Sequence, residues 1–173
     1  MGQLHLSELD LDKVNKVKEK VENHSNAIMD IVNSIITPYC SSLDNYVAFI
    51  GDCLKDGETP PTNDELDDFC MNLSTLIYFA GGMCEQLGIK DDISKAVYKE
   101  VYHSARAVQE GTVADKDSLA ELEAQQEQLT NICYNRAYKI MKSKVDNAQE
   151  LLGSCKKVLS RRMAELELTR IQR

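Results

Sequence analysis

Basic side chains dominate the C-terminal part of the chain: residues 136–173 carry 10 Lys and Arg against 4 Asp and Glu. Cations spaced along a helix can contact the phosphates of a nucleic acid, which gives salt-dependent binding with little sequence preference. The candidates for nucleic-acid binding are Arg136, Lys139, Lys142, Lys157, Arg161 and Arg162. The alternative is an ordinary solvated helix face, because Asp146 and Glu150 interrupt the row.

Two tyrosines accompany this basic segment. Tyr134 and Tyr138 lie one helical turn apart and flank Arg136, so their rings are candidates for stacking on unpaired bases. Packing at a seam between helices is the alternative, and the same choice applies to Tyr98 and Tyr102.

Acidic residues cluster earlier in the chain, and we expect them to contact a basic protein partner. The candidates are Asp64, Glu65, Asp67 and Asp68. The alternative is that they occupy a helix start, where the backbone dipole favours acids. The stretch lacks the glycine and the terminal glutamate of an EF-hand loop, so calcium is not predicted.

The sequence predicts no catalytic residue, cofactor or metal site. The three histidines are far apart, and there is no nucleophile elbow, phosphate-binding glycine loop or zinc-protease motif. No two cysteines form a Cys-x-x-Cys pair, so we expect reduced thiols in a cytoplasm, several of them buried on helix stripes. These cysteines are Cys40, Cys53, Cys70, Cys84, Cys133 and Cys155.

Charge is distributed unevenly between the two parts of the chain. Residues 1–100 contain 8 basic and 18 acidic side chains, whereas residues 101–173 contain 12 basic and 10 acidic ones. Hydrophobic residues make up 43% of the chain and charged residues 28%, which is typical of a folded domain. No apolar run is long enough to span a membrane, and we expect no secretory signal.

Apolar residues recur at intervals of three and four over most of the chain, which predicts helices. A first helix should begin near Ser7 and end near Ile36, with Pro38 starting a second one that runs to Leu54. Residues 55–61 should form a loop, because they contain a glycine and paired prolines.

Thr62 and Glu65 form a predicted capping box for the next helix. Gly81-Gly82 should interrupt that helix, as a kink or a close approach, and Gly88 should end it. A further helix should run from Asp91 or Asp92 to Gly111. The last helix should be capped by Asp115 or by the Ser118 and Glu121 pair and reach about Leu168.

We therefore expect an all-α protein with a bundle of about five helices. Residues 1–111 should form its acidic portion and residues 112–173 one long basic helix within the same domain. Unbroken, that helix would measure about 75 Å at 1.5 Å per residue. It must break, with Gly153-Ser154 as the expected place, or project, or pair with another chain.

The stretch from Tyr98 to Leu168 resembles small helical proteins of tailed bacteriophages, and is similar to the recombination mediator family among them. The residues that carry the resemblance are Tyr98, Tyr102 and Ala105-Arg106, then 111–116, Arg136-Ala137-Tyr138-Lys139 and 156–163. The resemblance implies helical oligomers that bind single-stranded DNA and load a recombinase. The matching positions are Arg136, Lys139, Arg161 and Arg162.

Together these observations predict a non-catalytic, oligomerising accessory protein in the cytoplasm of a phage-infected bacterium. It should touch single-stranded nucleic acid through the basic C-terminal helix and another protein through the acidic half, away from membranes. Two alternatives stay open. One is an acidic inhibitor of a protein interaction, as in phage counter-defence, and the other is a virion or scaffold component assembled through the long helix.

Overall fold

The computed structural model describes residues 11–55 and 60–171, and these residues form four helices. The helices are α1 (Leu11–Lys55), α2 (Asn63–Val108), α3 (Val113–Glu123) and α4 (Gln125–Ile171). The all-α class is therefore confirmed, with four helices in place of about five.

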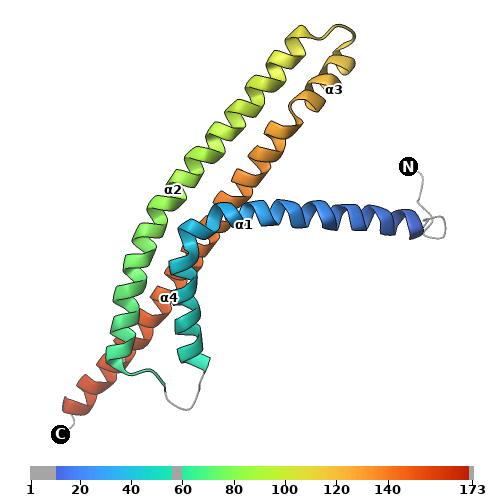
Figure 1. Ribbon diagram of the computed structural model, residues 1–173. Helices are drawn as coiled ribbons and strands as arrows, with labels where there is room; N and C mark the ends of the chain where they lie inside the picture. The colour runs from blue at the N-terminus through green and yellow to red at the C-terminus, as the bar shows by residue number, and fades with distance from the viewer. Residues whose placement is uncertain (1–10, 56–59, 172–173) are drawn as a thin grey trace, which may run out of the picture.

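Helices α2 and α4 form a long antiparallel hairpin, and α3 continues the second arm of that hairpin at its closed end (Figure 1). The C-terminal half of α1 packs against both α2 and α4, so one part of the hairpin becomes a three-helix bundle. The N-terminal half of α1 projects away from it (Figure 1). The hydrophobic core lies where the three helices meet.

A seven-residue repeat explains why the hairpin pairs over so great a length. On α2, five buried residues recur at intervals of seven, and on α4 three more do so. Successive heptads keep a seam on one side of a helix and favour coiled-coil packing. The residues are Leu66, Leu73, Ala80, Leu87 and Ser94 on α2, and Met141, Ala148 and Cys155 on α4.

A polar layer interrupts this seam between α2 and α4. The amide of Asn135 donates to Asp91 Oδ2 at 2.9 Å, and that of Asn131 donates to Ser94 Oγ at 3.0 Å. Asn131 also lies 3.4 Å from Asp91 Oδ1. Polar groups at a seam favour the one alignment in which they satisfy each other. The layer thus specifies the register of the hairpin.

Two capping boxes begin α2 and α3. The predicted box is confirmed: the Glu65 amide donates to Thr62 Oγ1, and Thr62 N donates back to the Glu65 carboxylate. A second box joins Thr112 and Asp115 in the same way, so Thr112 is the cap and the predicted caps at Asp115 and Ser118 are wrong. Hydrogen bonds from Thr62 and Thr112 lower the pKa of Glu65 and of Asp115.

The hairpin reverses close to the predicted glycine. Helix α2 ends at Val108, and Gly111 has a φ of 120°, a conformation that other residues rarely adopt. The glycine therefore permits the sharp turn that leads directly into the Thr112 cap.

The predicted break at Pro38 is wrong, because α1 continues through it. Proline cannot donate the hydrogen bond to the carbonyl of residue 34, and it bends a helix that packing holds together on both sides. The ribbon of α1 turns sharply in this region (Figure 1). The predicted start at Ser7 lies outside the described residues.

Three further glycine positions were predicted to break helices, and all three predictions are wrong. Helix α2 runs through Gly81-Gly82 and Gly88, and α4 runs through Gly153-Ser154. Residues 112–173 instead divide at Ala124, whose ψ of 11° departs from helical geometry. Packing along the seam outweighs a helix penalty of about 1 kcal/mol per glycine.

Replacing Gly81 and Gly82 by alanine should stabilise the fold by about 2 kcal/mol, because alanine favours a helix by about 1 kcal/mol per site. A Cβ at either position meets no atom within 4 Å. Thermal unfolding at fixed protein concentration measures the change. Gly88→Ala is the control, since its Cβ would lie 3.3 Å from the Tyr138 ring and should stabilise less. A destabilised Gly81→Ala/Gly82→Ala protein would mean that these glycines permit a close helix approach.

The six cysteines are free thiols, and five of them are buried. Burial raises the pKa of Cys40 to about 11, helped by the hydrogen bond that its thiol donates to Asp44. Burial likewise raises the pKa of Cys70, Cys84, Cys133 and Cys155. These thiols act as small core residues.

Candidate nucleic-acid interface

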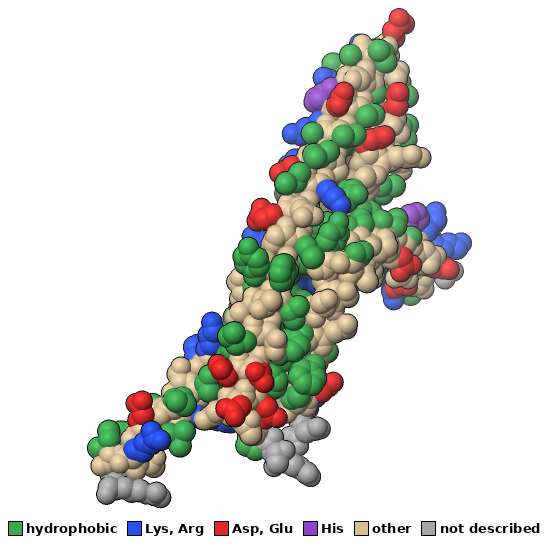
Figure 2. Space-filling model, turned by 60° about the vertical axis from the view of Figure 1, so that its left-hand side comes forward, with side chains coloured by type: hydrophobic (Ala, Val, Ile, Leu, Met, Phe, Trp, Pro, Cys, Tyr) green, Lys and Arg blue, Asp and Glu red, His purple; other side chains and the backbone are tan. Residues whose placement is uncertain are grey.

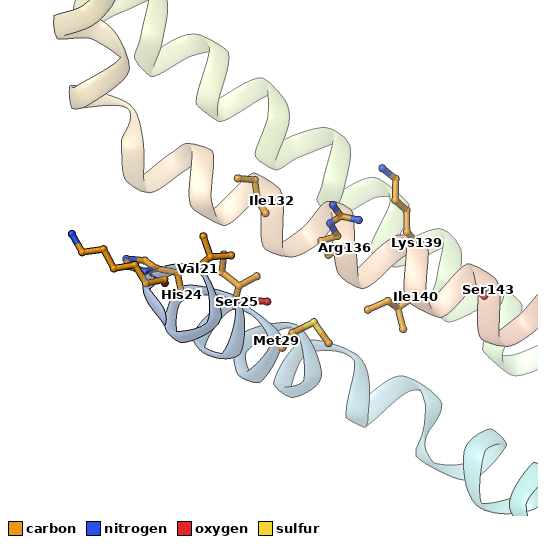
Figure 3. A pocket seen from close by; sticks show the side chains of 11 residues that line it. Val21, His24, Ser25, Met29, Ile132, Arg136, Lys139, Ile140 and Ser143 are labelled. Carbon is orange, nitrogen blue, oxygen red and sulfur yellow. Dashed lines mark hydrogen bonds between the residues drawn. The ribbon is translucent and has the colours of Figure 1, made fainter. Parts of the chain in front are cut away.

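A cleft of about 740 Å³ lies between the projecting half of α1 and the middle of α4. Figure 3 shows its two walls, with Arg136 and Lys139 on α4 and His24 on α1. Lys20 adds another cation to the α1 wall. The remaining lining is largely apolar: Val21, Ile28, Met29, Ile132 and Ile140. The cleft therefore combines positive charge with a hydrophobic floor.

The path of α1 creates this cleft. Val32 and Ile36 of α1 are buried in the bundle, whereas residues 20–29 lie across the cleft from residues 132–143 of α4. Figure 1 shows that α1 bends between its projecting half and the half that packs in the bundle, and Pro38 lies inside the helix. Two segments more than 100 residues apart thus supply the two walls.

A hydrogen bond defines the tautomer of the histidine on the α1 wall. His24 Nδ1 lies 2.6 Å from the carbonyl oxygen of Lys20, and because a carbonyl only accepts, Nδ1 carries the proton. The Nε2 atom is left to accept a hydrogen bond, or to donate one when the ring is protonated. His24 thus adds an imidazole to the three cations Arg136, Lys139 and Lys20 that line the cleft.

Four of the predicted nucleic-acid-binding residues are exposed cations. Arg136, Lys139, Lys142 and Lys157 make no ion pair or hydrogen bond with any part of the chain that the structure describes. Lys144, in the same basic segment, differs: its Nζ lies 2.7 Å from Asp44 Oδ1 and ties α4 to α1. The unpaired cations therefore point to solvent, where phosphates can reach them.

The two remaining predicted cations belong to another part of α4. Arg162 donates to the carbonyl of Pro61, and its Nη1 also lies 3.5 Å from Asn63 Oδ1, so it anchors α4 to the start of α2. Arg161 lies 3.9 Å from Glu165 on the exposed surface. About 37 Å of helix separates Arg136 from Arg161 at 1.5 Å per residue. The structure thus does not bring Arg161 and Arg162 to the cleft, and Lys142 and Lys157 do not line it either.

The two predicted stacking tyrosines lie toward α2. The Tyr138 ring packs 3.3 Å from the position of a Cβ on Gly88, which favours the packing interpretation. Tyr134 is half-buried and lines a different hollow, beside Lys90 and Val97. Neither tyrosine lines the basic cleft, so we leave both out of the proposed interface.

The predicted acidic surface lies at the other end of the bundle. Glu65 is engaged in its capping box, whereas Asp64, Asp67 and Asp68 are exposed on the first turns of α2. Figure 2 shows acidic side chains gathered beside the connection between α1 and α2. Glu65 therefore fits the helix-start interpretation. The three aspartates are exposed, as a surface that binds a partner would require.

Sequence reasoning missed Lys20 and His24, because no local pattern indicates which distant helix a cation will face. The recurrence of lysine at positions 13, 16 and 20 was the available signal. Within residues 11–55 and 60–171, no group of three or more His, Cys, Asp or Glu side chains is placed to hold a metal ion. In the same ranges, no helix is apolar over a length sufficient to cross a bilayer.

Comparison of the chain with protein-family models, with curated proteins and with solved structures finds no significant match.

Proposed function

We propose that this protein is a non-catalytic accessory factor that self-associates and binds single-stranded nucleic acid through the basic surface of α4. The observation that supports it most directly is the cleft that Arg136 and Lys139 of α4 line together with Lys20 and His24 of α1. Phosphates of a flexible strand are the ligand that such a row of cations fits best.

The shape of the cleft favours a single strand over a duplex. Its apolar floor offers contact area to unstacked bases, whereas a duplex presents mainly phosphates and sugars at its surface. The resemblance to phage recombination mediators points to the same ligand. The exposed aspartates at the α1–α2 end are the proposed contact for a basic protein partner.

Replacing Arg136 and Lys139 by glutamine should weaken binding to a fluorescent single-stranded oligonucleotide and reduce its salt dependence. Each lost phosphate contact lowers the slope of log K against log salt by about 0.7, so the double variant should lose about 1.4. Fluorescence anisotropy over a series of salt concentrations measures both quantities.

The control is Lys95→Gln/Lys99→Gln, which removes the same charge from exposed positions on α2. It should bind much as the unmodified protein does. Absence of binding at low salt would refute the proposal, and equal losses in the two variants would mean that only net charge matters.

A further inference from the structure

The groove between α2 and α4 is only partly filled by α1. At this part of the hairpin Tyr39 of α1 contacts α2, where its hydroxyl accepts a hydrogen bond from Lys90 Nζ at 2.9 Å. The groove then continues as a hollow of about 420 Å³ that starts at Lys90. A third helix therefore covers one part of the hairpin and leaves the rest open.

The open groove has an apolar wall and a buried acid. Ile93 and Val97 of α2 line it and are 57% and 43% exposed. Glu127 of α4 also lines it, and its Oε2 atom is buried without a hydrogen bond from any residue that the structure describes. A buried carboxylate oxygen of this kind is costly unless a donor or cation reaches it.

The same end of the hairpin is negatively charged. Residues 110–127 contain 6 acidic side chains and only 1 basic one. An occupant of the groove should therefore be a helix with an apolar stripe and several cations.

The projecting arm of α1, residues 11–31, has these properties. Leu11, Val14 and Val17 are exposed and recur at intervals of three, and Val21, which lines the basic cleft, continues the same helix face. The 4 lysines of the arm all lie within residues 13–20 with a single acid, and Asp12, Glu22 and Asp30 lie on either side of that segment. The arm is about 30 Å long, and the hollow extends for about 10 Å along α2 between Lys90 and Val97, so about two turns of the arm would fill it.

The arm does not lie in the groove of its own molecule. Its residues 20–29 stand beside Arg136 and Lys139 instead, and its N-terminal end points away from the hairpin (Figure 1). One molecule thus presents both a helix with an uncovered apolar face and a groove that fits such a helix.

We propose that the arm of one copy packs into the open α2–α4 groove of a second copy. The apolar stripe covers Ile93 and Val97, and the arm lysines approach Glu127 and its acidic neighbours. Two copies that exchange arms form a closed dimer, whereas one-way insertion extends into a chain of molecules. This inference rests on the self-association in the proposed function and assigns the surfaces that carry it.

Size-exclusion chromatography with light scattering on the full chain tests the assignment. Val14→Asp/Val17→Asp alters the arm, and Ile93→Asp/Val97→Asp alters the groove. Both pairs are exposed in one molecule, and circular dichroism should show unchanged helix content. Each variant should weaken self-association at least tenfold, while the unmodified protein stays associated at the same concentration.

Mixing the two variants gives the decisive result. The arm variant keeps an intact groove and the groove variant an intact arm, so together they should form a complex through one restored contact. Met71→Asp/Tyr78→Asp is the matched control on an exposed face of α2 and should self-associate normally. A monomeric unmodified protein, two variants that still assemble, or a mixture that stays monomeric would each overturn the proposal.

The test separates this proposal from nucleic-acid binding. Arg136→Gln/Lys139→Gln leaves the arm stripe and the groove intact, so it should assemble normally even where it has lost the oligonucleotide. Assembly without nucleic-acid binding would refute the proposed ligand alone. Oligonucleotide binding by an unmodified protein that stays monomeric would refute the arm contact and the self-association, and would leave the proposed ligand standing.

Discussion

Leu73→Ala should lower the free energy of unfolding by about 3 kcal/mol, within the range of about 2–5 kcal/mol measured for buried leucines. Leu73 is 0% exposed and belongs to the core that α1, α2 and α4 build together. Truncation there removes contacts between helices and leaves a cavity that three long helices cannot easily close. Urea denaturation at fixed protein concentration measures the change.

Met71→Ala is the control, because Met71 lies on the same helix and is 67% exposed. It should change the stability by less than about 0.5 kcal/mol. A small effect of Leu73→Ala would mean that the three helices do not pack as a single core.

Asp91→Ala should lower the free energy of unfolding by about 1 kcal/mol, because it removes hydrogen-bond acceptors from two partly buried amides. Asn135 loses its hydrogen bond of 2.9 Å, and Asn131 loses one of its acceptors. Urea denaturation measures the free energy of unfolding of this variant and of Asp92→Ala, which alters an exposed neighbour. The difference between the two isolates the effect of the polar layer. Equal stabilities of the two variants would contradict the proposed role of the layer.

An apolar replacement of the whole layer should act in the opposite direction. Asp91, Ser94, Asn131 and Asn135 changed together to leucine or alanine leave no donor unpaired, and buried polar groups often stabilise less than apolar ones. The variant should lose the unique alignment of α2 with α4, because an apolar seam does not distinguish one register from a shifted one. Loss of a single sharp set of amide NMR signals would reveal such mixed registers.

The all-helical class followed from the spacing of apolar residues, and so did the capping box at Thr62. The helix boundaries inside long segments were mispredicted at Pro38, Gly81-Gly82 and Gly153, because local propensity was weighed without the seam that overrides it. A seam depends on contacts between segments far apart in the chain. A short segment of sequence therefore does not show how strongly the seam stabilises a helix that contains glycine or proline.

The basic candidates were predictable in part. Charge counting found Arg136 and Lys139, but it also included Arg162, which the structure uses to hold α2 and α4 together. Charge alone cannot distinguish a cation that serves a ligand from one that satisfies a backbone carbonyl. The opposing wall, with Lys20 and His24, depends on the course of α1, and the recurrence of lysine at 13, 16 and 20 does not indicate which helix these side chains will face.

The repeat along α2 and α4 also limits how the length of this molecule can change. A helix turns by about 100° per residue, so removing one residue rotates everything beyond it away from its partner. Deletions or insertions of seven residues, made at the same level in both helices, bring the buried faces back into alignment without a change in helix winding. The rod can therefore be shortened or extended in steps of about 10 Å, whereas steps of three or four residues locally overwind or unwind the paired helices.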